Sequence, residues 1–166
     1  STDLLSRVID PPRLYNPILP ECLIRRTPED FQVDEIPAYQ PTGAGEHGYL
    51  WIEKRGLTSP ELIHRIVRNL GVPVKEIGLA GQKDRHAVTR QFVSVPKRFT
   101  EHAEKRNDDN IKVLMVTAHP NKLKTGHLRG NRFRLVLRSL SGAFTPQDTQ
   151  AVHDRLQLLT TDGFPN

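Results

Sequence analysis

A single carboxylate lies between two cations in the segment GLAGQKDRHAVTRQFVSVP, which runs from Gly78 to Pro96. Asp84 follows a glycine turn and lies between Lys83 and Arg85. Both cations would favour the ionised carboxylate, and an ionised carboxylate suits a nucleophile or a base better than a proton donor. The same pattern is also typical of a solvated ion cluster on a surface loop. The pattern alone leaves both interpretations open.

A histidine near this carboxylate suggests a second kind of chemistry. His86 lies two residues beyond Asp84, so the two could form an acid–base couple, although a polar loop histidine has the same spacing. None of the seven histidines has a paired metal-ligand spacing, and the single cysteine, Cys22, excludes a cysteine-rich zinc site. We therefore expect no metal. No P-loop, dinucleotide fingerprint or G-x-S-x-G motif is present, so we expect no nucleotide cofactor.

The charge of the chain favours a polyanionic partner. Its 166 residues carry a formal charge of +5. From Lys122 to Arg138 there are two lysines, four arginines and one histidine, with no acid. In an extended strand, Arg132 and Arg134 would share one face with Arg138, and this face could follow phosphates or simply be solvated. Phe133, on the opposite face, is more typical of a core residue than of a stacking platform.

The sequence indicates a protein of a reducing compartment. One cysteine allows no internal disulfide framework, which favours the cytoplasm. No apolar run is long enough to span a bilayer, so we expect no membrane association. Residues 1–22 are rich in proline and lack the basic and apolar regions of a signal peptide, which predicts an extended arm. Nothing in the sequence indicates an oligomeric state.

Two segments predict helices. In residues 58–71 the apolar residues recur at helical spacing, with Ser59 as the expected cap and Gly71 as the stop. A second helix is expected between its cap Thr145 and its stop Gly163.

The remaining regular segments are typical of strands. Residues 23–37 predict either a β-hairpin or a strand, a turn and a strand, with Phe31, Val33 and Glu35 on one face. The other expected strands lie within 49–55, 74–81, 87–95, 111–120 (buried by its composition) and 131–140. Strands predominate over the two helices. This predicts an α+β fold with a mixed, mainly antiparallel sheet flanked by helices.

Residues 78–95 closely resemble the signature of the TruD family of tRNA pseudouridine synthases, G-x-K-D-x-x-A-x-T-x-Q. The matching positions are Gly81, Lys83, Asp84, Ala87, Thr89 and Gln91. Two more segments match in the family's order: RRTPEDFQVDEIP contains its P-E-D-F motif, and LRGNRFRLVLR contains its G-N-x-F strand. The resemblance extends from about Leu23 to Asn166.

The resemblance implies a chemistry and a set of site residues. Family members convert a uridine of tRNA, uridine 13 in bacteria, to its C-glycoside isomer without a metal or a cofactor. The essential aspartate would be Asp84, acting as a nucleophile or as a base. Substrate-binding roles would fall to Phe31, Asn131, Lys83, Arg25, His86 and Phe133. The basic segment from Lys122 to Arg134 would face the tRNA.

The resemblance also implies a domain organisation. In the family a G-x-P-N step leads into a tyrosine–phenylalanine–glycine motif, and here GFPN forms residues 163–166. We therefore expect residues 23–166 to be the N-terminal half of a catalytic domain, without its inserted second domain and final strands. Two other functions stay open: a non-catalytic RNA-binding module of the same fold, and an acid–base hydrolase that uses Asp84 with His86.

Overall fold

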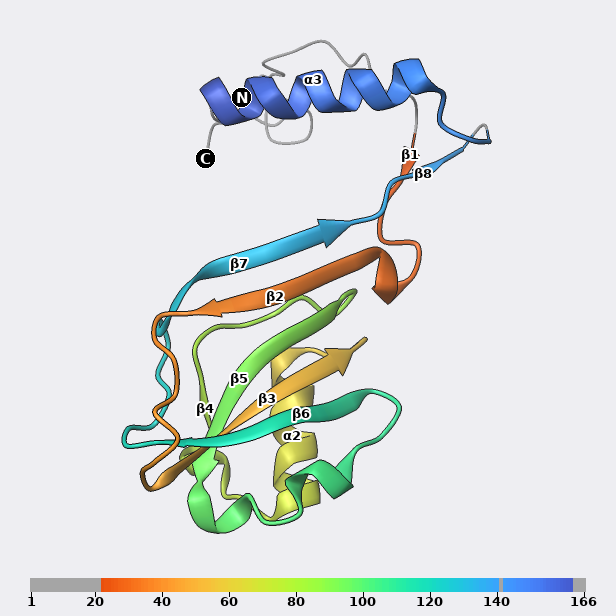
Figure 1. The fold of residues 1–166 in the computed structure, drawn as a ribbon. Coiled ribbons are helices and arrows are strands. Elements are labelled where there is room, and N and C mark those ends of the chain that lie inside the picture. The colour runs from red at the N-terminus through yellow and green to blue at the C-terminus, as the bar shows by residue number, and fades with distance from the viewer. Residues whose placement is uncertain (1–21, 141, 163–166) are drawn as a thin grey trace, which may run out of the picture. The chain divides into compact units, whose positions relative to one another are not determined.

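The computed structural model of the chain describes residues 22–140 and 142–162 (Figure 1). The chain divides into two units. The larger unit is Ile24–Leu137, and the smaller one contains the described residues on either side of it.

The larger unit is built on one six-stranded sheet with the strand order β6-β3-β5-β2-β7, and β4 also pairs with β5 (Figure 1). The strands are β2 (Phe31–Pro37), β3 (His47–Arg55), β4 (Gly78–Leu79), β5 (Val88–Pro96), β6 (Ile111–His119) and β7 (Leu128–Leu135). Only the pair of β2 and β5 is parallel, and the other pairs are antiparallel. This arrangement confirms the predicted α+β fold with a mixed, mainly antiparallel sheet.

Strand β2 lies between β5 and β7, and both of these strands are far from it in the sequence. A 3-10 turn over Pro28–Asp30 precedes it, and β1 (Cys22–Leu23) does not pair with it. The hairpin interpretation of residues 23–37 is therefore wrong, and the strand, turn and strand interpretation holds. Phe31, Val33 and Glu35 are all buried, as their alternation predicts.

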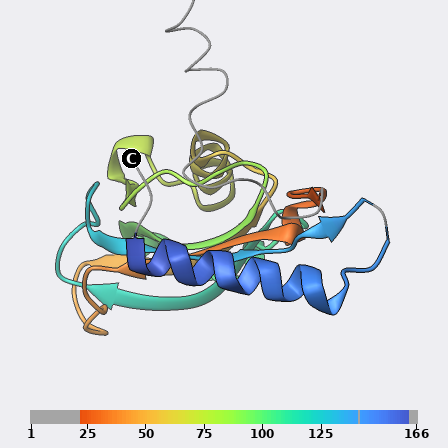
Figure 2. The same ribbon diagram turned by 90° about the horizontal axis from the view of Figure 1, so that it is seen from above.

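Helix α2 (Ser59–Leu70) covers one face of this sheet, as Figure 2 shows. Leu62 and Ile66 of the helix join a core cluster that includes Leu50, Ile52 and Val93 of the sheet. The helix ends at Gly71, whose φ of 73° is the left-handed conformation that favours glycine at a C-cap. Burial of these apolar side chains is what attaches the helix to the sheet.

The N-cap of α2 is Thr58, and the prediction of Ser59 is wrong by one residue. The Thr58 hydroxyl accepts a hydrogen bond from Glu61 N at 3.3 Å, and the Glu61 carboxylate accepts one from Thr58 N at 2.6 Å. This reciprocal pair is a capping box. Ser59 is buried instead, and its hydroxyl accepts a hydrogen bond from Lys83 N at 3.0 Å.

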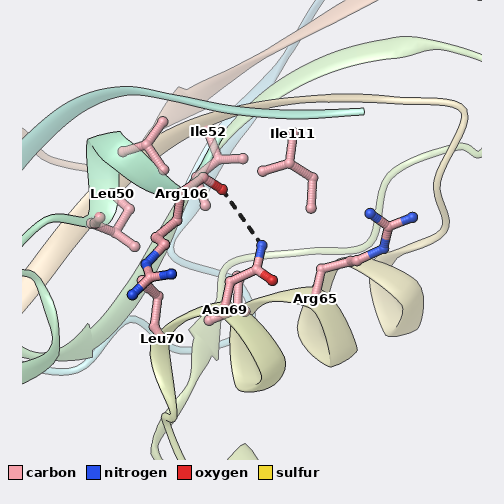
Figure 3. Close-up of a pocket in the computed structure, with 10 residues that line it drawn as sticks. Leu50, Ile52, Arg65, Asn69, Leu70, Arg106 and Ile111 are labelled. Atoms are coloured by element: carbon pink, nitrogen blue, oxygen red, sulfur yellow. Dashed lines mark hydrogen bonds between the residues drawn. The ribbon is translucent and has the colours of Figure 1, made fainter. Parts of the chain in front are cut away.

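A small apolar cavity remains between α2 and the sheet (Figure 3). Its volume of about 20 Å³ holds no more than a water molecule. At its rim Asn69 Nδ2 donates to Arg106 O at 3.5 Å, and Arg65 pairs with Asp108 at 2.7 Å. This space is a gap in the core and is too small for a substrate.

Two strand predictions differ from the structure. Strand β6 is at an edge of the sheet, so Leu114 and Met115 are exposed and the prediction of a buried strand is wrong. An apolar composition does not distinguish a central strand from an edge strand. Strand β7 ends at Leu135, and Arg138 belongs to β8 (Arg138–Ser139). Arg138 therefore does not continue the row of Arg132 and Arg134.

The described residues of the smaller unit form one short strand pair and one helix. Strand β1 pairs with β8 in antiparallel fashion. Helix α3 (Pro146–Asp162) confirms the second helix, and Thr145 Oγ1 accepts from Asp148 N at 3.2 Å as its cap. The expected stop Gly163 and the arm up to residue 21 lie outside the described residues. Neither α2 nor α3 is long and apolar enough to cross a membrane.

Gly78 holds β4 close to the segment before β7, and we predict that Gly78→Ala destabilises the fold. An added Cβ would overlap Leu123 O and Ser94 Oγ. Overpacking of this kind costs about 1–3 kcal/mol. Urea unfolding of the intact protein measures this change. Gly130→Ala is the control, because its Cβ would meet no atom within 4 Å. Equal stability of the two variants would contradict the close approach.

Candidate active site

Asp84 lies in the loop between β4 and β5, with its carboxylate held at both oxygens. Oδ1 accepts a hydrogen bond from His86 N at 2.9 Å, which is the pattern of an Asx turn. Oδ2 accepts one from Arg25 Nη1 at 3.2 Å. The side chain is still 36% exposed. The loop and the arginine therefore orient a carboxylate that a substrate can reach.

Arg25 connects this carboxylate to an aromatic ring. Its guanidinium carbon lies 4.2 Å from the centroid of the Phe31 ring, a cation–π contact. Arg25 has a φ of 55°, in the left-handed region that non-glycine residues seldom adopt. A conformation of this kind costs roughly 1–3 kcal/mol and is often found at functional sites.

A second ring lies parallel to Phe31. The centroids of Phe31 and Phe133 are 5.9 Å apart, and the ring planes differ by 3°. Phe31 is 8% exposed, whereas Phe133 is 63% exposed. The prediction of Phe133 as a core residue is wrong, because in the described part of the chain β7 is an edge strand and the ring is open to solvent. The pair therefore leaves the Phe133 ring exposed next to Phe31, which Arg25 connects to Asp84.

The two cations next to Asp84 in sequence have other partners. Lys83 Nζ forms a buried ion pair with Glu35 Oε2 at 2.8 Å. Arg85 Nη2 lies 3.7 Å from Glu61 Oε1. The expectation that Lys83 and Arg85 act directly on the Asp84 carboxylate is therefore wrong. The Asp84 carboxylate forms its ion pair with Arg25 instead.

Glu35 is a site residue that the sequence interpretation missed. Its second oxygen, Oε1, accepts a hydrogen bond from Phe92 N at 3.3 Å, so both carboxylate oxygens have partners. A signal was available, because alternation placed Glu35 on the buried face of β2. A buried carboxylate requires a cation, and Lys83 supplies it.

Lys54 is a second residue that the sequence did not indicate. Its ammonium is fully buried and donates to Leu57 O at 2.5 Å and to Asp84 O at 2.9 Å. Burial is the main cause that lowers the pKa of Lys54 to about 8. Lys54 therefore fixes the backbone of the Asp84 loop from inside the fold, at a cost in desolvation.

His86 contacts Asp84 through its backbone. Within the described residues, no hydrogen bond joins the His86 imidazole to the Asp84 carboxylate, and the imidazole is exposed. This geometry does not support the acid–base couple on which the hydrolase hypothesis depends.

Several signature residues contain buried polar atoms that have no hydrogen-bond partner among the described residues. They are Thr89 Oγ1, both amide atoms of Gln91, and Asn131 Oδ1. Thr89 pairs with Val33, and Asn131 pairs with Glu35, so their side chains share the sheet face of Phe31. An unpaired buried polar atom costs about 1–3 kcal/mol. This face of the sheet thus carries buried polar atoms without a partner among the described residues.

The three motifs that are far apart in sequence meet at this site. Arg25 and Phe31 come from the first motif, Asp84 from the second and Phe133 from the third, and contacts link all four. In the part of the chain that the structure describes, no group of three or more His, Cys, Asp or Glu side chains is placed to hold a metal ion.

Comparison with known proteins assigns a family to this arrangement. A family model described as tRNA pseudouridine synthase D (TruD) matches residues 20–166. The chain belongs to this family. A TruD relative from Thermus thermophilus is 44% identical over 144 residues, which are 86% of this chain and 39% of that protein. One from Geotalea daltonii is 45% identical and covers 87% of this chain and 35% of its own length.

A solved structure supports the same TruD assignment. The putative tRNA pseudouridine synthase D (TruD) from Methanosarcina mazei superposes with a TM-score of 0.75 and 29% sequence identity. The match covers 87% of this chain and 33% of that one. The chain thus spans about two fifths or less of the length of these TruD proteins.

We predict that the buried charge of Lys54 makes stability depend on pH. The pKa of Lys54 is about 8 in the folded chain and 10.5 in the reference state. Between these values the unfolded chain binds the extra proton, so the free energy of unfolding rises with pH. Compared with that of the Lys54→Met variant, the free energy of unfolding of the intact protein should increase by up to about 3 kcal/mol between pH 8 and pH 10.5.

Urea unfolding at several pH values measures this difference. Lys105→Met, which removes an exposed lysine, is the control and should show no comparable gain. A difference between the intact protein and Lys54→Met that stays constant with pH would contradict a buried ammonium.

Proposed function

We propose that the intact protein isomerises a uridine of tRNA, uridine 13, to pseudouridine, with Asp84 as the essential carboxylate. The observation that carries this proposal is an accessible carboxylate, held by Arg25 and adjacent to stacked rings of which Phe133 is largely exposed. A tRNA substrate implies a cytoplasmic, RNA-binding protein.

The reaction needs a carboxylate and an accessible base. The bond between N1 and C1′ breaks, a bond between C5 and C1′ forms, C5 loses its proton and N1 gains one. Substrate and product have the same atoms, so the reaction consumes no oxidant, reductant or group donor. A carboxylate can attack C1′, attack the base or remove a ribose proton. Each role uses its ionised form, and the Arg25 guanidinium 3.2 Å away stabilises that charge.

The target base must leave the RNA stack to reach Asp84. We assign the stacking contact with this base to Phe133, because its ring is open to solvent, and a supporting role to the buried Phe31. The Asn131 amide, with an unpaired oxygen, would hydrogen-bond the edge of the base. His86 would contact the nucleotide from the loop, while Lys83 holds the loop in place through Glu35.

Replacement of Asp84 tests the catalytic role. We expect Asp84→Asn in the intact protein to lower the rate of pseudouridine formation by at least about a hundredfold, because the amide has no negative charge. The affinity for tRNA should change little. Chromatography of the digested nucleosides measures the product, and filter binding measures the affinity.

Asp109→Asn is the matched control, since it removes the same charge from an exposed loop. It should retain normal activity. Near-normal activity of Asp84→Asn would contradict the catalytic role, and product from a tRNA without uridine at position 13 would contradict the target. Binding of tRNA by the unmodified protein without any product would indicate the RNA-binding module instead.

Replacement of Phe133 tests the stacking role. Loss of a base–aromatic stack costs about 1–3 kcal/mol, so Phe133→Ala should lower kcat/KM by roughly 5- to 150-fold. The free energy of unfolding should change little, because the ring is largely exposed. Leu135→Ala, on the same face of β7 and also exposed, is the control. An equal loss in both variants would argue against stacking.

A further inference from the structure

A second concave site lies at the opposite end of the same sheet. A hollow of about 530 Å³ lies there and is rich in basic and aromatic side chains. Among its lining residues are Tyr39, His47, His119, Lys122, Lys124 and His127. No acidic residue lines it, and Glu46, which precedes His47, is not part of its wall.

The register of the strands separates this hollow from Asp84. His47 begins β3 and pairs with His119 of β6 and with Pro96, the last residue of β5. Asp84 lies in the loop that leads into Val88, the first residue of β5, and so at the other end of that strand from Pro96. Nine strand residues at about 3.3 Å each put the two sites on the order of 25–30 Å apart.

A chain of hydrogen bonds fixes the orientation of His127. The Tyr49 hydroxyl donates to Asn121 O at 2.9 Å, so its single proton is used. The Tyr39 hydroxyl, 3.1 Å away, must then donate to the Tyr49 oxygen. The hydroxyl oxygen of Tyr39 then accepts a hydrogen bond from His127 Nδ1 at 2.8 Å. Burial raises the pKa of Tyr49, which keeps this chain of donors in place. His127 therefore carries a proton on Nδ1.

Other contacts make this wall rigid. The Tyr39 ring stacks on His119, with centroids 4.8 Å apart and planes 21° apart. The buried Nδ1 atoms of His47 and His119 have no hydrogen-bond partner in the described part of the chain. The His119 ring is thus packed against Tyr39, and the two unpaired Nδ1 atoms are buried in the wall of the hollow.

The two lysines of the hollow keep their charge available. Lys122 Nζ donates to Lys75 O at 2.6 Å, a carbonyl that orients the ammonium without neutralising it. Lys124 is exposed. Among the described residues, neither lysine forms an ion pair with a carboxylate. The two ammonium groups of this hollow provide donors that a phosphate oxygen accepts from, and the His127 ring can add its Nε2 as a donor only as an imidazolium.

We propose that this hollow binds a phosphate group of the tRNA backbone, several nucleotides from the base that reaches Asp84. The proposal rests on the proposed function, since it takes tRNA to be the substrate. The sheet then serves as a spacer between the reacting base and a second point of attachment. A contact of this kind adds affinity and register and carries no sequence information.

The test measures the affinity of the intact protein for tRNA over a range of salt concentrations. Each lost phosphate contact reduces the slope of log K against log salt by about 0.7–0.9. Lys124→Gln and His127→Gln should each weaken binding several-fold at low salt, and Lys124→Gln should lower the slope by about that amount. In turnover assays the loss should appear in KM and not in kcat. Lys105→Gln, an exposed lysine outside the hollow, is the control.

The outcomes separate the two proposals. Unchanged affinity and slope in both variants would overturn the phosphate site, even if the unmodified protein forms pseudouridine. A protein that binds tRNA with the expected slopes but forms no pseudouridine would overturn the proposed function and leave the site intact. Inorganic phosphate tests whether the hollow binds a phosphate of the RNA backbone. In the unmodified protein it should compete with tRNA for the hollow. Binding of phosphate at His127 without competition would overturn the assignment to the RNA backbone.

Discussion

The buried ion pair between Lys83 Nζ and Glu35 Oε2, at 2.8 Å, is the constraint on which the site depends. Removing one partner would leave an uncompensated charge in the interior, which costs about 3–5 kcal/mol. The pair therefore ties the residue before Asp84 to the central part of β2. Ser59 Oγ and Lys54 Nζ hold the backbone of the same loop, at Lys83 N and Asp84 O. These contacts position the catalytic candidate through its backbone and its neighbour Lys83, in addition to the contacts of its own carboxylate.

Several unfavourable features occur at this site and close to it. Lys54 is buried without an ion-pair partner among the described residues, Arg25 has a left-handed backbone, and Thr89 and Gln91 leave buried polar atoms unpaired. Each feature lowers stability in the free protein. The apolar contact of α2 with β3 and β5 offsets these costs. Such a distribution is typical of a functional site supported by a well-packed core elsewhere.

Local patterns in the sequence predicted the local structure well. Helical periodicity predicted α2, cap and stop residues predicted α3, and alternation predicted the buried face of β2, because all three depend on residues that are neighbours in the chain. The signature pointed to Asp84 through its resemblance to a family. Properties that depend on the order of strands were not predictable in this way. The exposure of Phe133 and Leu114 follows from the edge positions of β7 and β6, which no local pattern encodes. Lys54 and Glu35 acquire their roles only through partners 30 and 48 residues away.

The parallel pairing of β2 with β5 explains how one sheet can position two candidate sites. This pairing places the start of β2, with Phe31, beside the start of β5, which follows Asp84, so the aromatic ring and the carboxylate meet at one end. The antiparallel partner β3 necessarily begins at the far end of β5, and it brings His47 there. The loop from β6 to β7 returns to that same end and brings Lys122 and Lys124. A rigid sheet thus fixes the distance between the carboxylate and the basic hollow, and a bound RNA would have to match it.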